Sequence, residues 1–217
     1  SESIADTLIN GIFGRVTGDA GSRFVIAIGQ AIFLVLFLIL YGDCIAARQR
    51  IGAVYFFSRI SNRKKWILKE FVWLLFYSVL YTFCFVGMHM IFSIWGSSEA
   101  DLSGTLFKVA FQIGLFLTLL LFEMAVLCNL FCAAGGSAIG ILLSMLCVIG
   151  LIMWSTAEVD GMVSEMINPM WLSADIIENG GSYIQKIIIV FLQTAICAVG
   201  TGYYLAKRDL FAREGEG

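Results

Sequence analysis

Glu123 is the residue whose chemistry fits its surroundings least, because its carboxyl group lies within a long apolar stretch. Gln112 lies in the same stretch. A carboxylate in hydrocarbon is costly, so Glu123 is expected to face a partner or a cavity, or to be protonated. Gln112 lies eleven positions earlier, about 1100° of helical rotation, so both side chains fall within about 20° on one helix face. Two interpretations stay open: an interhelical hydrogen bond that fixes packing, and a substrate pathway or gate.

Other polar and small residues in the apolar stretches favour helix packing. Isolated polar side chains commonly hold membrane helices together, and this is the favoured interpretation for Gln30, His89, Asn129 and Gln193. Small residues at every fourth position let helix backbones approach closely. Two such strips are present, Gly136, Gly140 and Ser144 in one stretch and Ala198 and Gly202 in another. Packing within the subunit is the expected role of both strips.

The residue sets that catalysis and metal binding need are missing from the sequence. There is a single histidine, and Cys128 and Cys132 supply at most two thiolates at helical spacing, so a zinc site is not expected. Neither a G-x-x-x-x-G-K-[ST] loop nor a G-x-S-x-G elbow occurs. The six cysteines fall in or at the ends of apolar stretches, where they act as small apolar residues. The chain is therefore predicted not to be an enzyme and to need no cofactor and no disulfide.

The elements that must hold these residues are membrane-spanning helices. The 217 residues are 59% hydrophobic and 14% charged, whereas a soluble domain carries about a quarter charged residues. Five apolar stretches approach the roughly 20 residues that a spanning helix needs. The predicted fold is an all-α integral membrane domain with spans at 24–44, 71–95, 106–132, 138–154 and 183–206.

The distribution of charge predicts the orientation of these spans. The 45–70 linker holds seven Lys and Arg residues and the 207–217 tail holds three more, so both are placed in the cytoplasm. The 155–182 segment carries acidic residues and no basic ones, and is placed outside. By alternation, 96–105 is external and the turn at 133–137 is internal.

The segment 1–23 is then external, yet it has no signal-like start that would carry it across the membrane. An upstream first helix, giving six spans in the full protein, is the favoured explanation. A processed five-span protein is the alternative.

The cytoplasmic linker contains an apolar patch followed by a basic run. The apolar patch consists of Val54, Tyr55, Phe56 and Phe57, and together with the adjoining Ser58 and Arg59 it is called the linker patch below. In one interpretation, its aromatic rings lie among the lipid headgroups and its basic residues bind anionic lipid. The other makes the patch a plug for a cytoplasmic partner.

The linker resembles that of type 2 ABC transporter permeases (ABC-2). In that family a small-residue turn, an apolar stretch and a basic run with serine lead into the third helix. The matching residues are Arg50-Ile51-Gly52-Ala53, Ser58-Arg59-Ile60-Ser61-Asn62-Arg63 and Trp66-Ile67-Leu68-Lys69. The ending Gly202 to Phe211 is similar as well. Two departures are Gln49 and Arg50 in place of a common acidic residue before the turn, and the absence of the family's first helix.

The resemblance implies a permease that pairs with a second permease subunit, as a homodimer or a heterodimer, and with separate ABC ATPase subunits. It assigns ATPase coupling to the linker patch. It also implies short external helices at 155–182 that cap the path, with Met170, Trp171 and Leu172 as the apolar tip. An acidic cap anchored at the headgroups by Trp171 is the alternative for this segment.

The expected function is therefore ATP-driven export of a hydrophobic or amphipathic cargo, such as an antimicrobial peptide, across a bacterial cell membrane. The C-terminus is expected in the cytoplasm. Membrane lipid is an expected partner, and nucleic acid is not, because no basic patch with interleaved aromatic residues occurs. Two other functions stay open: a non-transporting scaffold or sensor accessory, and a proton-coupled secondary transporter that uses Glu123.

Overall fold

The computed structural model describes residues 4–13, 20–52, 63–96, 104–156 and 181–207. Helices make up nearly all of this part of the chain, and it contains no strand. Five helices are long and apolar enough to cross a membrane, which confirms the predicted all-α fold with five spans. They are α2 (Ala20–Tyr41), α4 (Arg63–Gly96), α5 (Gly104–Gly135), α6 (Ser137–Thr156) and α9 (Gly181–Lys207). A sixth span in the full protein stays a prediction.

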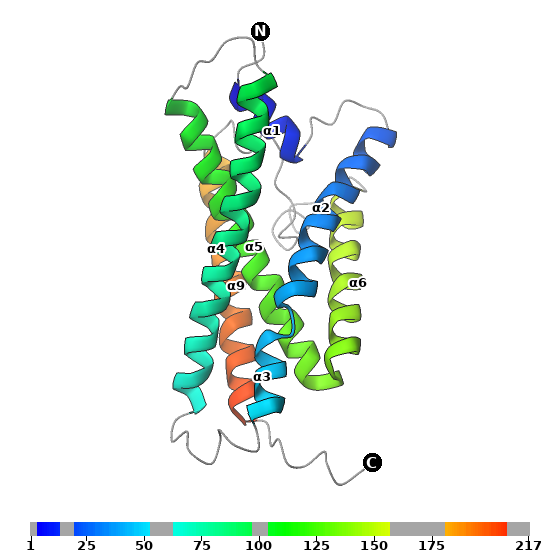
Figure 1. The fold of residues 1–217 in the computed structure, drawn as a ribbon, viewed down its shortest axis with the longest axis vertical. Helices are drawn as coiled ribbons and strands as arrows, with labels where there is room; N and C mark the ends of the chain where they lie inside the picture. Colours follow the sequence, from blue (N-terminus) through cyan, green and yellow to red (C-terminus); the bar gives the residue numbers. More distant parts are fainter. Residues whose placement is uncertain (1–3, 14–19, 53–62, 97–103, 157–180, 208–217) are drawn as a thin grey trace.

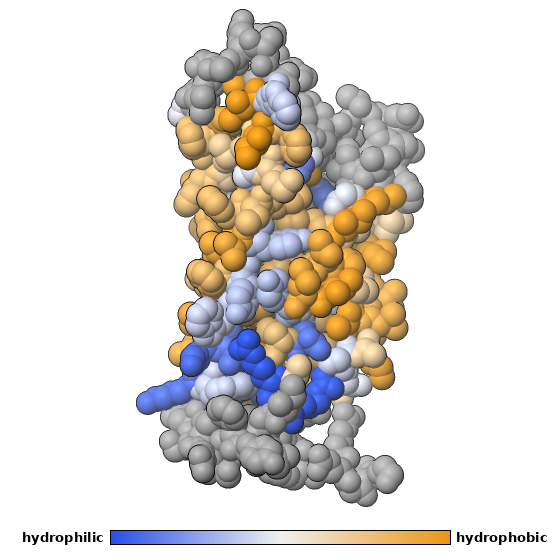
Figure 2. All heavy atoms as spheres, in the orientation of Figure 1, coloured by the Kyte–Doolittle hydropathy of each residue, from blue (hydrophilic) through white to orange (hydrophobic). Residues whose placement is uncertain are grey.

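The bundle is built around α5. It crosses between α4 and α9 on one side and α2 and α6 on the other (Figure 1). Two thirds of its apolar span is buried, 67%, against 22–33% for the other four spans. Those four turn large apolar side chains outward, such as Phe83, Leu142 and Ile196, as helices facing lipid do (Figure 2). Because α5 contacts all four other spans, a movement of α5 would displace each of them.

Two short helices cover the ends of this bundle. At one end, α1 (Ile4–Phe13) packs on α4, α5 and α2, and buries Ile4, Leu8, Ile9 and Ile12. Their spacing places these four side chains on one helix face. At the other end, α3 (Cys44–Gly52) follows α2 after a two-residue turn and packs on α5. Neither helix was predicted, because both are too short to span a membrane and lie in ranges assigned as 1–23 and 45–70.

The helices also extend beyond the hydropathy ranges. α4 begins eight residues before 71 and contains 34 residues, about 51 Å at 1.5 Å per residue, against about 30 Å of hydrocarbon. Its first two turns carry Arg63, Lys64, Lys65 and Lys69. Charged residues do not stop a helix. Hydropathy therefore marks where a helix leaves the hydrocarbon, and the helix itself can begin several residues earlier.

A single residue separates α5 from α6. Gly136 has a φ of +94°, a left-handed conformation that glycine adopts without a side-chain clash. The sharp reversal brings Gly140 against α5, where an added Cβ would lie 2.3 Å from the backbone nitrogen of Cys132. At Gly202 an added Cβ would lie 3.3 Å from the ring of Phe71 on α4. Both glycines therefore pack within the subunit, as expected.

Basic residues gather at the end of the bundle that carries α3, seen as the blue region in Figure 2. The described ones there are Arg48, Arg50, Arg63, Lys64, Lys65, Lys69 and Lys207. Lys108 and Lys186, near the start of α5 and α9, belong to the opposite half. This asymmetry underlies the predicted orientation, which stays a prediction.

Candidate functional site

The turn between α2 and α3, together with α3 itself, forms a segment called the elbow below. Gly42 starts the turn, and its N–H donates to the Leu38 carbonyl at 2.8 Å. A side chain at Gly42 would meet the Leu38 oxygen at 2.4 Å and the Cys128 Sγ at 2.7 Å. The chain can therefore change direction here while touching α5, because glycine leaves room for the contact.

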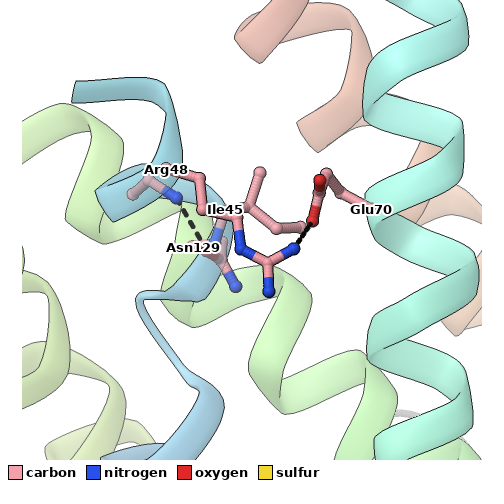
Figure 3. Close-up of polar contacts among 5 residues, drawn as sticks. Ile45, Arg48, Glu70 and Asn129 are labelled. Atoms are coloured by element: carbon pink, nitrogen blue, oxygen red, sulfur yellow. Dashed lines mark hydrogen bonds and ion pairs between the residues drawn. The ribbon is translucent and has the colours of Figure 1, made fainter. Parts of the chain in front are cut away.

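Asn129 of α5 caps the start of α3. Its Oδ1 accepts hydrogen bonds from the backbone N–H groups of Ile45, at 2.9 Å, and Ala46, at 3.1 Å (Figure 3). Its Nδ2 donates to the Ala125 carbonyl at 2.8 Å. The first N–H groups of a helix have no partner within the helix, so a buried helix start needs such an acceptor. Asn129 is fully buried and so performs the packing role expected for it.

An ion pair joins α3 to α4. The Arg48 guanidinium donates to Glu70 Oε2 at 2.5 Å (Figure 3). The Glu70 side chain is 8% exposed and that of Arg48 is 48% exposed, so the pair lies at the edge of the protein with its acidic member inside. Sequence reasoning did not single out Glu70. Its signal was that it is the one acidic residue among the seven basic ones of the 45–70 linker.

A third set of contacts joins the elbow to α6. Ser137, the first residue of α6, donates from Oγ to Asp43 Oδ2 at 2.9 Å. The Arg50 guanidinium donates in turn to the Ser137 Oγ. Together with Asn129 and Glu70, these contacts fix the elbow to α4, α5 and α6. A displacement of the chain after Gly52 would therefore pull on three spanning helices at once.

Glu123 lies on the side of α5 that faces α9, six residues before Asn129 on the same helix. It is 5% exposed, with Oε2 at 3.2 Å from the Thr194 hydroxyl and Oε1 at 3.8 Å from the Cys197 thiol. These three residues are called the acid site below. No group of three or more His, Cys, Asp or Glu side chains that would hold a metal ion occurs in the described ranges.

Gln112 lies at the same helix interface, nearer the start of α5. The Tyr183 hydroxyl of α9 donates to its backbone carbonyl at 2.7 Å, while the Gln112 side chain is half-buried. Gln112 and Glu123 thus both lie where α5 meets α9. The packing role and the pathway role of this pair both stay predictions.

Among the other predicted residues, His89 packs beside a ring of its own helix and beside α1, whereas the packing roles expected of Gln30 and Gln193 stay predictions. The His89 ring lies 4.6 Å from that of Phe85 and beside Gly11 of α1. The whole linker patch, 54–59, and the predicted cap residues Met170, Trp171 and Leu172 lie outside the described residues.

Five apolar spans, four of them packed around the buried central helix α5, place the chain in the class of helical membrane proteins. No protein-family model, no curated protein and no solved structure matches the chain. The elbow and the acid site are therefore interpreted from their own geometry.

Proposed function

We propose that this chain is the permease subunit of an ATP-driven exporter of the ABC-2 kind, with separate ATPase subunits that bind the linker patch. Two copies, or two related chains, form the path for a hydrophobic or amphipathic cargo such as an antimicrobial peptide. The resemblance of the linker, the five spans and the basic end of the bundle support this proposal. The chain itself hydrolyses no ATP and resides in a bacterial cell membrane with its C-terminus in the cytoplasm.

The observation that carries the proposal is the attachment of the elbow. α3 ends at Gly52, one residue before the start of the 53–62 segment that contains the linker patch. Asn129, Glu70 and Ser137 hold α3 on three different spanning helices. A flexible tether would need no such attachment. A lever that passes the movement of an ATPase to α5 needs it, because rigid elements move together when one of them is displaced.

The test is co-purification of the chain with a P-loop ATPase encoded beside it. Burial of one aromatic side chain stabilises a complex by roughly 1.5 to 3 kcal/mol. Tyr55→Asp with Phe56→Asp is therefore expected to weaken ATPase binding by well over tenfold. The matched control is Met170→Asp with Leu172→Asp, a double change in the segment predicted to be external, which should leave ATPase binding unchanged.

Other outcomes identify the competing functions. Undiminished ATPase in the Tyr55→Asp, Phe56→Asp variant, at equal membrane abundance, would rule out docking on the linker patch. If that patch rests on lipid, neutralising Arg63, Lys64 and Lys65 should have the larger effect on the linker. A chain that never retains an ATPase and moves no cargo would be a scaffold or sensor accessory.

The buried position of Glu123 favours a second candidate, a proton-coupled transporter. A carboxyl group inside the membrane is a common proton carrier. In that case an imposed proton gradient should drive transport in vesicles that contain the chain alone. Transport that requires ATP and an ATPase, and does not respond to the gradient, would exclude this candidate.

A further inference from the structure

The hydrogen atoms available at the acid site determine how Glu123 is bonded. A threonine hydroxyl has one hydrogen to donate and two lone pairs to accept with. Thr194 Oγ1 lies 2.7 Å from the Val190 carbonyl oxygen and 3.2 Å from Glu123 Oε2. The carbonyl can only accept, so the hydroxyl hydrogen belongs to the shorter contact with Val190. The contact between Thr194 and Glu123 is then a hydrogen bond only if the carboxyl group supplies the hydrogen.

The surroundings of Glu123 also favour a neutral acid. Among the described residues, the polar side chains that contact its carboxyl group are Thr194 and Cys197, whose thiol is a weak donor. An ionised carboxylate that is 5% exposed would need a cation or several strong donors. Neither the Thr194 hydroxyl, whose hydrogen is already used, nor the thiol meets that need.

Apart from Cys197, the charged and titratable groups described on α4, α5 and α9 have their recorded contacts or positions away from Glu123, as follows. On α9, Lys186 lies eight residues before Thr194, about 12 Å along the helix axis. The Tyr183 hydroxyl donates its hydrogen to the backbone carbonyl of Gln112. On α4, the Phe71 ring lies 6.2 Å from the Phe122 ring of α5, and the adjacent Glu70 is paired with Arg48. On α5 itself, the Sγ atoms of Cys128 and Cys132 lie 3.9 Å apart, and the two residues follow Glu123 by five and nine positions.

We propose that the interface of α5 and α9 is a proton-binding site, in which Glu123 is a neutral carboxylic acid that donates its proton to the Thr194 hydroxyl. The bound proton holds α9 against the centre of the bundle. Loss of the proton leaves a buried carboxylate that must gain water, and α9 is the helix that yields. Its other described packing partner is α4, while its outer face, with Phe191, Ile196 and Val199, is exposed.

This inference does not rest on the proposed function, because the protonation state belongs to the chain alone. Its test is infrared spectroscopy of the full chain in phosphatidylcholine vesicles at pH 7, comparing wild type with Glu123→Gln. The expected difference is a carboxylic-acid C=O band that is present in the wild type and lost in the variant. A carboxylate band lost instead would overturn the proposal.

A second variant keeps the test valid if Glu123→Gln does not fold. Thr194→Val removes the acceptor but leaves the acid in place, so the C=O band should persist and shift to higher frequency. An unchanged band position would show that Glu123 does not donate to Thr194, and would overturn the proposal.

The effect of proton loss on α9 is measured by amide hydrogen exchange. Raising the pH until the acid band disappears should speed exchange in α9 by at least tenfold, after correction for the intrinsic pH dependence. The Glu123→Gln variant has no proton to lose, so α9 should show no such change. Equal acceleration in both proteins would contradict the role of the proton as the link between α5 and α9.

Discussion

Glu70 and Glu123 are equally buried, at 6% and 5% exposed when the whole residue is counted, yet one is paired with a cation and the other is not. Glu70 lies near the start of α4 and accepts a hydrogen bond from Arg48, whose half-exposed side chain keeps its charge near water. Glu123 lies deep between α5 and α9, where the polar groups beside it in the described part of the chain are a hydroxyl and a thiol. At the end of a helix, a long basic side chain reaches a buried acid at little cost. In the middle of the bundle, a proton can replace that cation.

The two regions are suited to different tasks because of these partners. The elbow contains an ion pair, a doubly bonded cap and a serine contact, which together fix its position. The acid site depends on one neutral hydrogen bond and is therefore the easier of the two to open. The predictions below test this contrast by weakening the elbow first.

The largest effect is expected from Asn129→Leu, which keeps the side-chain volume and leaves the buried N–H groups of Ile45 and Ala46 without an acceptor. Each unpaired buried group costs about 1 to 3 kcal/mol, so the free energy of unfolding should fall by about 2 to 5 kcal/mol. Detergent unfolding of the purified chain measures this loss. Gln112→Leu, a half-buried amide on the same helix, is the control and should cost far less. Similar losses for both variants would show that Asn129 does not hold the elbow.

Gly140→Ala should have the next largest effect, since the added methyl group would strike the α5 backbone at Cys132. The helices must separate, at a cost of about 1 to 3 kcal/mol. Gly150→Ala on the same helix is the control, because nothing lies within 4 Å of an added Cβ there. Thermal unfolding of both variants measures the difference, and a tolerated Gly140→Ala would contradict the close approach of α5 and α6.

The smallest effects are expected from double-mutant cycles, which compare the two buried acids directly. Changing Arg48 and Glu70 to Met should give a coupling of about 0.5 to 1.5 kcal/mol, reduced because Arg48 is half-exposed. Glu123→Leu with Thr194→Val should give about 0.6 kcal/mol, which is typical of a neutral hydrogen bond between membrane helices. Salt near 1 M should lower only the first coupling. Equal salt sensitivity would remove the distinction between the charged and the neutral site.

The sequence predicts the fold well because long apolar stretches have few structures open to them in a membrane. All five spans, the burial expected of Asn129 and the close packing at Gly140 and Gly202 follow from residue type and spacing. Two features escape this reasoning. α1 and α3 are amphipathic or polar, and they are stabilised by tertiary contacts with α5 that hydropathy does not contain.

The sites were less predictable, for a physical reason. Glu123 stands out in the sequence because no other charge surrounds it. Glu70 does not, because it lies among basic residues and looks like part of a solvated linker. Its ion pair depends on α3 packing on α5 with Arg48 beside α4, and that position depends on Asn129, 59 residues further along the chain. A pairing of this range leaves no local pattern.

The most direct test concerns which side of the membrane the elbow faces, because an ATPase can act only on the side that holds ATP. In a cysteine-free background, Lys65→Cys places a thiol on the exposed first turns of α4, and Gly104→Cys places one at the exposed start of α5, at the opposite end of the bundle. An impermeant maleimide added to intact cells should label Gly104→Cys and should reach Lys65→Cys only after the cells are permeabilised. Labelling of Lys65→Cys in intact cells, with Gly104→Cys protected, would place the elbow outside and contradict the proposed coupling to an ATPase.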